Sequence, residues 1–443
     1  MPDIHITSAV LRAVSKGRFG EDELIQIAVA HLLELCPTCR SEVAAFRDEP
    51  ESTGCSNSEF DQVFTNLAAN ASDLDTALEA ERERADADFR ALIKLKPEQR
   101  IARMQRATRR FRSPFLAEQL IAECRHALPG ASDLAFEYSQ LALQVALSLP
   151  SPLHEEYRAL AMAHKGNALR VSGDLLAARE VIDQARNVVR AEGVVDSLVL
   201  AEVDLMEGGL NRDQRRFSQS EALLIRSIKL FEVGGDIVRA AAVLLSLGEL
   251  YRDAGRLDQA IEVLDRAEKC QELRARPRLA LCALHNRLFY LAEAGKFAEA
   301  RQGLCDGYQR YQEFPDHWTQ LRLSWLEAKI DAGLGYLDQA VESFQATRDG
   351  FLRDGKGYDA ALVSLELATV LLEIGRTQEV RRVAHEIAAV FEAQDVHREA
   401  MAALVLFQQA AEAEEVTKQF LGQFTRYLEQ ARRDPSLRFR KPS

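Results

Sequence analysis

The ten residues HLLELCPTCR, near the start of the chain, bring together the side chains most typical of a metal site. His31 is followed by Cys36 and Cys39, so one imidazole and two thiols fall within nine positions. Imidazole and thiolate are the usual ligands of zinc, and a two-residue gap lets both cysteines reach one tetrahedral ion. The spacing therefore predicts a Zn²⁺ site. A structural role is favoured over a catalytic one, because no general base accompanies these ligands.

The surrounding sequence explains why a metal would be needed here. EDELIQIAVAHLLEL has the pattern of an amphipathic helix that ends near the metal-binding histidine. The Pro-, Gly- and Ser-containing stretch DEPESTGCSNSEFD then reads as a linker. We therefore expect a small module over residues 1–48, followed by a linker and connecting helix over residues 49–92. A module of this size cannot build a sufficient core alone. The fourth ligand is predicted to be His5, with Cys55, a water or an open position as alternatives.

The same stretch resembles the zinc-binding module of bacterial anti-sigma factors, in which a histidine is followed by Cys-x-x-Cys-Arg. His31, Cys36, Cys39 and Arg40 match that pattern, with four residues rather than three between the histidine and the first cysteine. The resemblance implies that the module docks a partner protein. A sigma factor or another regulator is the partner it implies, with a role in transcriptional control.

The rest of the chain is organised by a regular interval. Six similar segments recur along the chain at a regular interval. Five of them begin with glycine and one begins with arginine, at positions Gly173, Arg215, Gly255, Gly295, Gly335 and Gly375. The last five positions are evenly spaced, at about 40 residues, as in a repeat architecture, and the first interval is slightly longer. Glycine enters the left-handed conformation at the C-terminal end of a helix without penalty. Each unit is therefore predicted to be a helix, a tight turn and a second helix.

Small residues recur on both sides of each turn. Seven residues before it most units carry Gly or Ala, and nine residues after it they carry a large apolar residue, as in Gly166 with Ile182 and Gly248 with Leu264. Small side chains let two helices approach closely, and the later positions follow a period near 3.6. The unit around Leu288 and the one at Arg215 depart from this pattern.

The units AHKGNALRVSGDLLAAREVIDQA and SLGELYRDAGRLDQAIEVLDRA resemble the tetratricopeptide repeat, over roughly residues 155–390. Their period is longer than the usual one of about 34 residues. The resemblance implies an all-α solenoid, which we expect to extend over residues 93–443 with atypical terminal units. It also implies a concave groove that holds a peptide or protein. Residues one and four places after the small position would face that groove: Asn167, Arg170, Arg212, Glu249, Arg252 and Lys329.

Composition limits the remaining possibilities. A net charge of -12 argues against a general nucleic-acid binder. The arginine-rich stretch of residues 99–112 is interpreted as a solvated helix whose positive charges balance those of the acidic run before it. No apolar stretch is long enough to span a membrane, and no signal peptide is recognisable, so we expect a cytoplasmic protein. We also expect Cys270, Cys282 and Cys305 to be small buried residues.

No sequence motif of a nucleotide-binding loop, a nucleophile elbow or a zinc protease is present. The sequence therefore predicts a non-enzymatic interaction scaffold or regulatory adaptor, with a partner in the repeat groove and a second partner on the zinc module. Two alternatives stay open. One is a redox sensor in which oxidation of Cys36 and Cys39 ejects zinc. The other is an enzyme with a site formed between repeats.

Overall fold

The computed structural model describes residues 71–107, 109–128, 131–393, 407–408, 411, 416–431 and 439. These residues form α-helices joined by short turns, and no strand occurs among them. The expected all-α fold is therefore confirmed for the part of the chain that is described. The chain divides into two compact units, which are described separately: residues 1–210 with 222–236, and residues 211–221 with 237–443.

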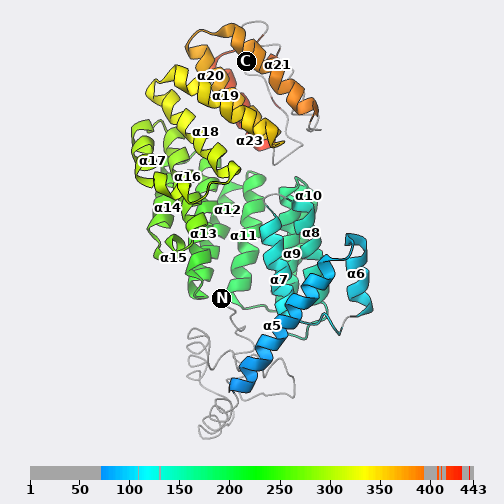
Figure 1. Ribbon diagram of the computed structural model, residues 1–443. Helices are drawn as coiled ribbons and strands as arrows, with labels where there is room; N and C mark the ends of the chain where they lie inside the picture. Colours follow the sequence, from blue (N-terminus) through cyan, green and yellow to red (C-terminus); the bar gives the residue numbers. More distant parts are fainter. Residues whose placement is uncertain are drawn as a thin grey trace. The chain divides into compact units, whose positions relative to one another are not determined.

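The described residues of unit 1 form a series of helices (Figure 1). The helices are α5 (Ala71–Ile93), α6 (Pro97–Arg106), α7 (Pro114–Ala127), α8 (Ser132–Ala146), α9 (Leu153–Val171), α10 (Leu175–Ala191), α11 (Ser197–Asp213) and α12 (Phe217–Val233). α7 packs on α8, α8 packs on α9, and α9 packs on α10. Paired helices therefore begin before the first turn glycine, in agreement with the expectation that the solenoid starts near residue 93.

Unit 2 continues the same pairing (Figure 1). Among the described residues, its complete helices are α13 (Ile237–Asp253), α14 (Leu257–Lys269), α15 (Gln271–Arg274), α16 (Pro277–Glu293), α17 (Phe297–Gln312), α18 (His317–Leu334), α19 (Leu337–Arg353), α20 (Gly357–Glu373), α21 (Thr377–Ala393) and α23 (Lys418–Ala431). We call α13, α16, α18 and α20 the first helices of their pairs, and α14, α17, α19 and α21 the second helices.

All six predicted turn positions adopt the left-handed conformation. The five glycines have φ between 75° and 92°, and Arg215 has φ 59°. Arg215 lies between α11 and α12, where its backbone takes the conformation that glycine adopts at the other five turns. The repeat geometry is therefore strong enough to impose a left-handed backbone on a residue that ordinarily avoids it.

The long period of the repeat comes from the helices rather than from the turns. α13, α19 and α20 each contain 17 residues. Three residues separate α13 from α14, and three separate α19 from α20. Two such helices with two such turns add up to one full repeat. The first interval is longer because five residues, 192–196, separate α10 from α11.

The small residues stand where a first helix meets its second helix. A Cβ added to Gly166 would lie 2.4 Å from Cγ1 of Ile182, and one added to Gly248 would lie 3.1 Å from Cγ of Leu264. Both large residues are fully buried. The predicted pairing of small and large positions is therefore confirmed, and close approach of the helices requires it.

The irregular unit around Leu288 reverses this arrangement. Here the large residue lies on the first helix, α16, and the glycine lies on the second helix, α17. A Cβ added to Gly303 would lie 2.6 Å from Cδ2 of Leu288, and one added to Gly307 would lie 2.5 Å from Cδ2 of Leu284. The unit has therefore exchanged its small and large positions and kept the close approach.

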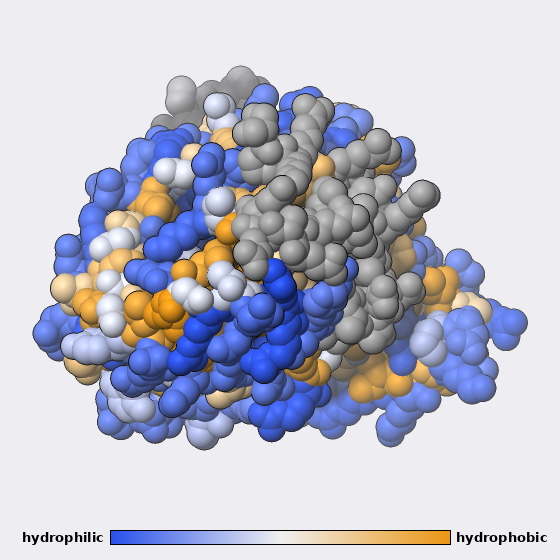
Figure 2. Space-filling view, turned by 90° about the horizontal axis from the view of Figure 1, so that it is seen from above, coloured by the Kyte–Doolittle hydropathy of each residue, from blue (hydrophilic) through white to orange (hydrophobic). Residues whose placement is uncertain are grey.

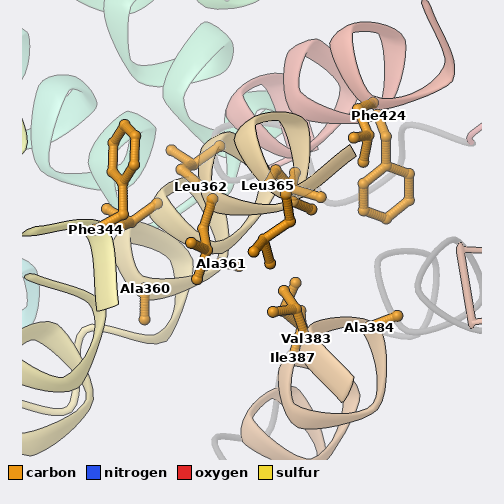
Figure 3. Close-up of a cluster of buried hydrophobic side chains, with 14 of the residues drawn as sticks. Phe344, Ala360, Ala361, Leu362, Leu365, Val383, Ala384, Ile387 and Phe424 are labelled. Atoms are coloured by element: carbon orange, nitrogen blue, oxygen red, sulfur yellow. The ribbon is translucent and has the colours of Figure 1, made fainter. Parts of the chain in front are cut away.

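Each unit has apolar clusters between its helix layers. In unit 2 the helix α20 is buried on most sides, since it packs against α19, α21 and α23. Figure 3 shows Leu362 and Leu365 of α20 among Phe344 of α19, Ile387 of α21 and Phe424 of α23. α23 therefore completes the core around the last described pair of helices.

The arginine-rich stretch is less solvated than its sequence suggested. Arg100 of α6 is only 8% exposed, and its Nη1 donates to Glu137 at 2.8 Å. Arg110 donates to Asp88 of the preceding acidic run at 2.7 Å. The pairing with the acidic run is confirmed, but the expectation of a wholly solvated helix was wrong because α6 packs against α8.

Among the described helices, none is both long and apolar enough to cross a membrane. Large apolar side chains that are exposed come from separate places, including Leu176 on α10, Val233 on α12 and Tyr336 before α19. The view in Figure 2 likewise shows hydrophobic residues interspersed with hydrophilic ones.

Substitution of Gly166 tests the close approach of α9 and α10. Gly166→Ala should lower the free energy of unfolding by about 1–3 kcal/mol, because the new methyl group overlaps the buried side chain of Ile182. The matched control is Gly422→Ala in α23, where a Cβ meets no atom within 4 Å. That substitution should raise stability by about 0.5–1 kcal/mol, as Ala favours a helix over Gly. Urea unfolding followed by circular dichroism measures both, and a Gly166→Ala protein as stable as the parent would contradict the packing.

Candidate functional site

The first helices of unit 2 form a layer of their own. α13 contacts α16, α16 contacts α18, and α18 contacts α20. α14, α17 and α19 each pack against the first helices on either side, and α21 packs against α20; in the described part of the chain no substantial contact joins two successive second helices. The first helices are therefore the more closely spaced layer, and this places them on the inner side of the repeats.

We define the first-helix face of unit 2 by the polar and aromatic side chains through which these helices touch one another. They are Glu249 and Arg252 of α13, Phe289 and Glu293 of α16, Arg322, Trp325 and Lys329 of α18, and Glu366 of α20. Three of the six predicted groove residues are among them.

A row of ion pairs links neighbouring first helices along this face. Arg212, at the end of α11, pairs with Glu249 of α13. Arg252 of α13 donates to Glu293 of α16 at 2.7 Å. Each cation thus reaches one helix forward, with charge-assisted hydrogen bonds that fix the register of adjacent units.

The same pattern recurs between α18 and α20. Lys329 donates to Glu366 at 2.7 Å, and the indole nitrogen of Trp325 donates to the other carboxylate oxygen at 3.2 Å. Burial disfavours the charge on Lys329, but the carboxylates of Glu366 and Glu293 together outweigh burial and raise the pKa of the lysine. Lys329 therefore keeps its positive charge in the folded protein.

Between α16 and α18 the contact is aromatic instead. The rings of Phe289 and Trp325 meet edge to face, with centroids 5.6 Å apart. The ammonium of Lys329 lies 4.9 Å from the centroid of Phe289. Phe289 is half-buried, so part of this ring remains available at the surface.

The helix α23 covers the part of the face formed by α20. Its Phe424 and Leu428 are fully buried in the core around α20. Its Glu429 pairs with Arg252, which also holds Glu293. Burial raises the pKa of Glu429, and Arg252 opposes that shift. At Arg252, the row of ion pairs therefore includes a carboxylate of the C-terminal helix α23.

Cys282 marks the accessible part of the face on α16. Its thiol is exposed, yet burial by surrounding protein raises its pKa. The expectation that Cys282 and Cys305 are buried was wrong, since both are exposed, and Cys270 is half-buried.

The two remaining predicted residues, Asn167 and Arg170, lie on α9 in unit 1. Asn167 is 7% exposed, and its amide oxygen accepts a hydrogen bond from Arg170 Nε at 2.9 Å. These two side chains are therefore engaged with each other along one helix.

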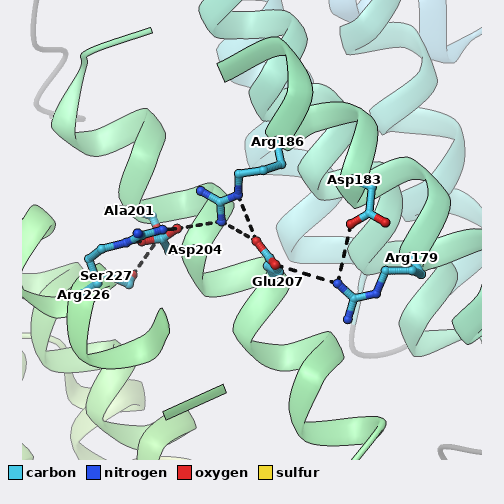
Figure 4. A network of polar contacts seen from close by, with 8 residues as sticks. All are labelled: Arg179, Asp183, Arg186, Ala201, Asp204, Glu207, Arg226 and Ser227. Carbon is cyan, nitrogen blue, oxygen red and sulfur yellow. Dashed lines mark hydrogen bonds and ion pairs between the residues drawn. The ribbon is translucent and has the colours of Figure 1, made fainter. Parts of the chain in front are cut away.

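Unit 1 also contains buried ionic networks that hold helices together. Asp204 of α11 is fully buried and accepts from Arg186 of α10 and Arg226 of α12, as Figure 4 shows. A second cluster joins Glu202 to Arg125 at 2.7 Å and to His164 at 3.1 Å. The first network connects the consecutive helices α10, α11 and α12, and the second connects α11 to α7 and α9; both account for these buried charges structurally.

The predicted zinc ligands His5, His31, Cys36 and Cys39, together with the alternative Cys55, lie outside the described residues. Within the described ranges no group of three or more His, Cys, Asp or Glu side chains is arranged to hold a metal ion. Whether zinc binds near the start of the chain stays a prediction.

Sequence reasoning missed several residues of the face, and the repeat could have found them. Cys282 and Arg322 are one repeat apart, as are His285 and Trp325. They occupy equivalent positions in the first halves of their helices. The prediction had considered only the positions that follow the small residue, in the second halves.

Comparison with known proteins gives a likeness in fold. No protein-family model matches the chain, and no curated protein matches it in sequence. Among solved structures, a Rap protein complexed with competence and sporulation factor superposes with a TM-score of 0.54 at 11% identity, over 72% of this chain and 91% of that one.

The chain shares its fold with a Rap protein. The all-α helical-repeat architecture expected from the sequence is thereby confirmed. Aspartyl phosphate phosphatase F from Bacillus subtilis also matches, at 13% identity over 95% of this chain and 97% of that one, with a TM-score of 0.41.

Proposed function

We propose that this protein is a regulatory adaptor that binds a peptide or protein segment on the first-helix face of unit 2. The observation that carries the proposal is the layer of first helices, in which equivalent positions of successive repeats place charged and aromatic side chains in one row. An extended segment is the ligand that such a row suits, because it can contact several repeats at once.

The electrostatics of the face favour binding over catalysis. The carboxylates of Glu249, Glu293 and Glu366 are each engaged by a cation of a neighbouring helix. Burial acts to raise the pKa of Glu293, but Arg252 holds that pKa below its usual value, and a carboxylate with a lowered pKa is a poor general base. A protein of similar fold, the Rap protein, was solved with competence and sporulation factor, which supports a bound partner.

Two exposed native cysteines allow the location of binding to be tested. Cys282 lies on the first helix α16 and Cys305 on the second helix α17. A benzophenone maleimide would be attached at Cys282 in the Cys305→Ser protein, and at Cys305 in the Cys282→Ser protein. Both proteins keep every other cysteine.

Each labelled protein would be irradiated with a phage-displayed library of short random peptides, and the phage that survive a denaturing wash would be counted. We expect covalent retention through Cys282 and only background through Cys305. Equal retention at both positions, or none at either, would remove the first-helix face as the binding surface.

We further propose that residues 1–48 form a zinc-stapled module that docks a second partner. The spacing of His31, Cys36 and Cys39 supports the zinc site. The resemblance to anti-sigma modules supports a sigma factor or another transcriptional regulator as the partner, and the protein would then act in the cytoplasm.

Elemental analysis of the purified full chain tests this module. The parent protein should contain about one zinc per chain, and Cys36→Ser should lose most of it because a tetrahedral structural site rarely survives the loss of a thiolate. Cys270→Ser is the matched control and should keep its zinc. Equal zinc in the parent and Cys36→Ser proteins would rule out this site.

A further inference from the structure

Arg322 is a half-buried cation of the first-helix face whose charge no carboxylate in the described part of the chain engages directly. It lies on α18, on the same side of the helix as Trp325 and Lys329, three and seven residues further on. Its Nε donates to His285 Nε2 at 3.2 Å. Its two Nη groups make no hydrogen bond or ion pair with any residue that the structure describes.

Other cations of the face differ from Arg322 in this respect. Arg212, Arg252 and Lys329 each pair with a glutamate of a neighbouring helix. The chain has 68 acidic and 56 basic residues, so carboxylates are in excess. Leaving a partly buried guanidinium without one is costly, because burial disfavours a charge that is not paired.

The surroundings of Arg322 do not supply the missing charge. Asp359 of α20 acts on it through space, and no ion pair or hydrogen bond joins the two residues. Burial outweighs this attraction, so the pKa of Arg322 is lowered from its usual value. The positive charge of the guanidinium is therefore not neutralised by a carboxylate of the described residues, and an anion that binds there would stabilise it.

His285 and Tyr311 hold the guanidinium in place. Because arginine is always a donor, His285 Nε2 must accept, so the proton of this neutral imidazole sits on Nδ1. Nδ1 then donates to the hydroxyl of Tyr311, 3.1 Å away. Burial keeps the pKa of His285 well below its usual value, with the Arg322 charge acting in the same direction. A fixed orientation lowers the entropic cost of binding at the free Nη edge.

We propose that Arg322 binds the side-chain carboxylate of an Asp or Glu in the segment that occupies the first-helix face. With Nε engaged by His285, the two Nη groups are left to hold the two carboxylate oxygens side by side. Phe289 and Trp325 offer apolar surface on the neighbouring turn for the residues that flank it. A side-chain carboxylate is favoured over a peptide's terminal carboxylate because an acidic residue within a segment has flanking residues that can contact this apolar surface and continue along α16 and α13.

The inference rests on the proposed binding surface and refines its specificity. The full chain would be used to select binders from phage-displayed random peptides, and one selected peptide would be synthesised. We expect one position of the selected sequences to be rich in Asp or Glu. Replacing that residue by its amide should weaken binding to the parent protein by about 10- to 100-fold.

Protein variants then assign the contact to Arg322. Arg322→Gln should lose a similar factor with the acidic peptide and almost nothing with the amide peptide. Arg287→Gln is the matched control, since Arg287 lies on α16 but pairs with Glu268 of α14. It should bind as the parent does. Thermal unfolding of each variant shows whether the fold is kept, and Arg322→Lys, which retains the charge, should recover part of the affinity.

Each outcome separates the two proposals. Selected peptides that crosslink at Cys282 but bind Arg322→Gln as tightly as the parent would overturn the Arg322 contact and leave the binding surface intact. Loss of binding on amidation of the peptide C-terminus alone would overturn the choice of a side-chain carboxylate. Failure to select any peptide would overturn both proposals.

Discussion

The close contact between a small residue on a first helix and a large residue on its second helix is the constraint on which the rest of the structure depends. Where Gly166 meets Ile182, or Gly248 meets Leu264, the space left for a Cβ is too small for an ordinary contact. That contact sets the helix spacing, and the long helices with their short turns set the length of the repeat. The exchange of sizes at Leu288 and Gly303 preserves the spacing.

Regular spacing brings equivalent positions of successive first helices within reach of one another. In unit 2 this allows Arg252 to reach Glu293 and Lys329 to reach Glu366. These pairs fix the relation between neighbouring repeats and neutralise most of the charge on the face. Arg322 differs because its neighbour on the adjacent first helix is the neutral His285. The same geometry that satisfies the other cations leaves this one able to bind an external anion.

The fold could be predicted from the sequence because small and large residues recur at fixed positions in each repeat. Gly255 and Gly335 mark turns by their conformational freedom, and the phase of the glycines was strong enough to assign a turn to Arg215. The functional face was predicted only in part. Arg252 and Lys329 were placed on it correctly, but their ion pairs depend on which helix lies next to which, and sequence periodicity carries no information about partners.

The central claim is that the first helices of unit 2 bind an extended segment, and a crystal structure of the full chain with a selected peptide tests it most directly. We expect the peptide along α13, α16 and α18, with a carboxylate at the Nη groups of Arg322. A peptide seated on the second helices α14, α17 and α19 would contradict it.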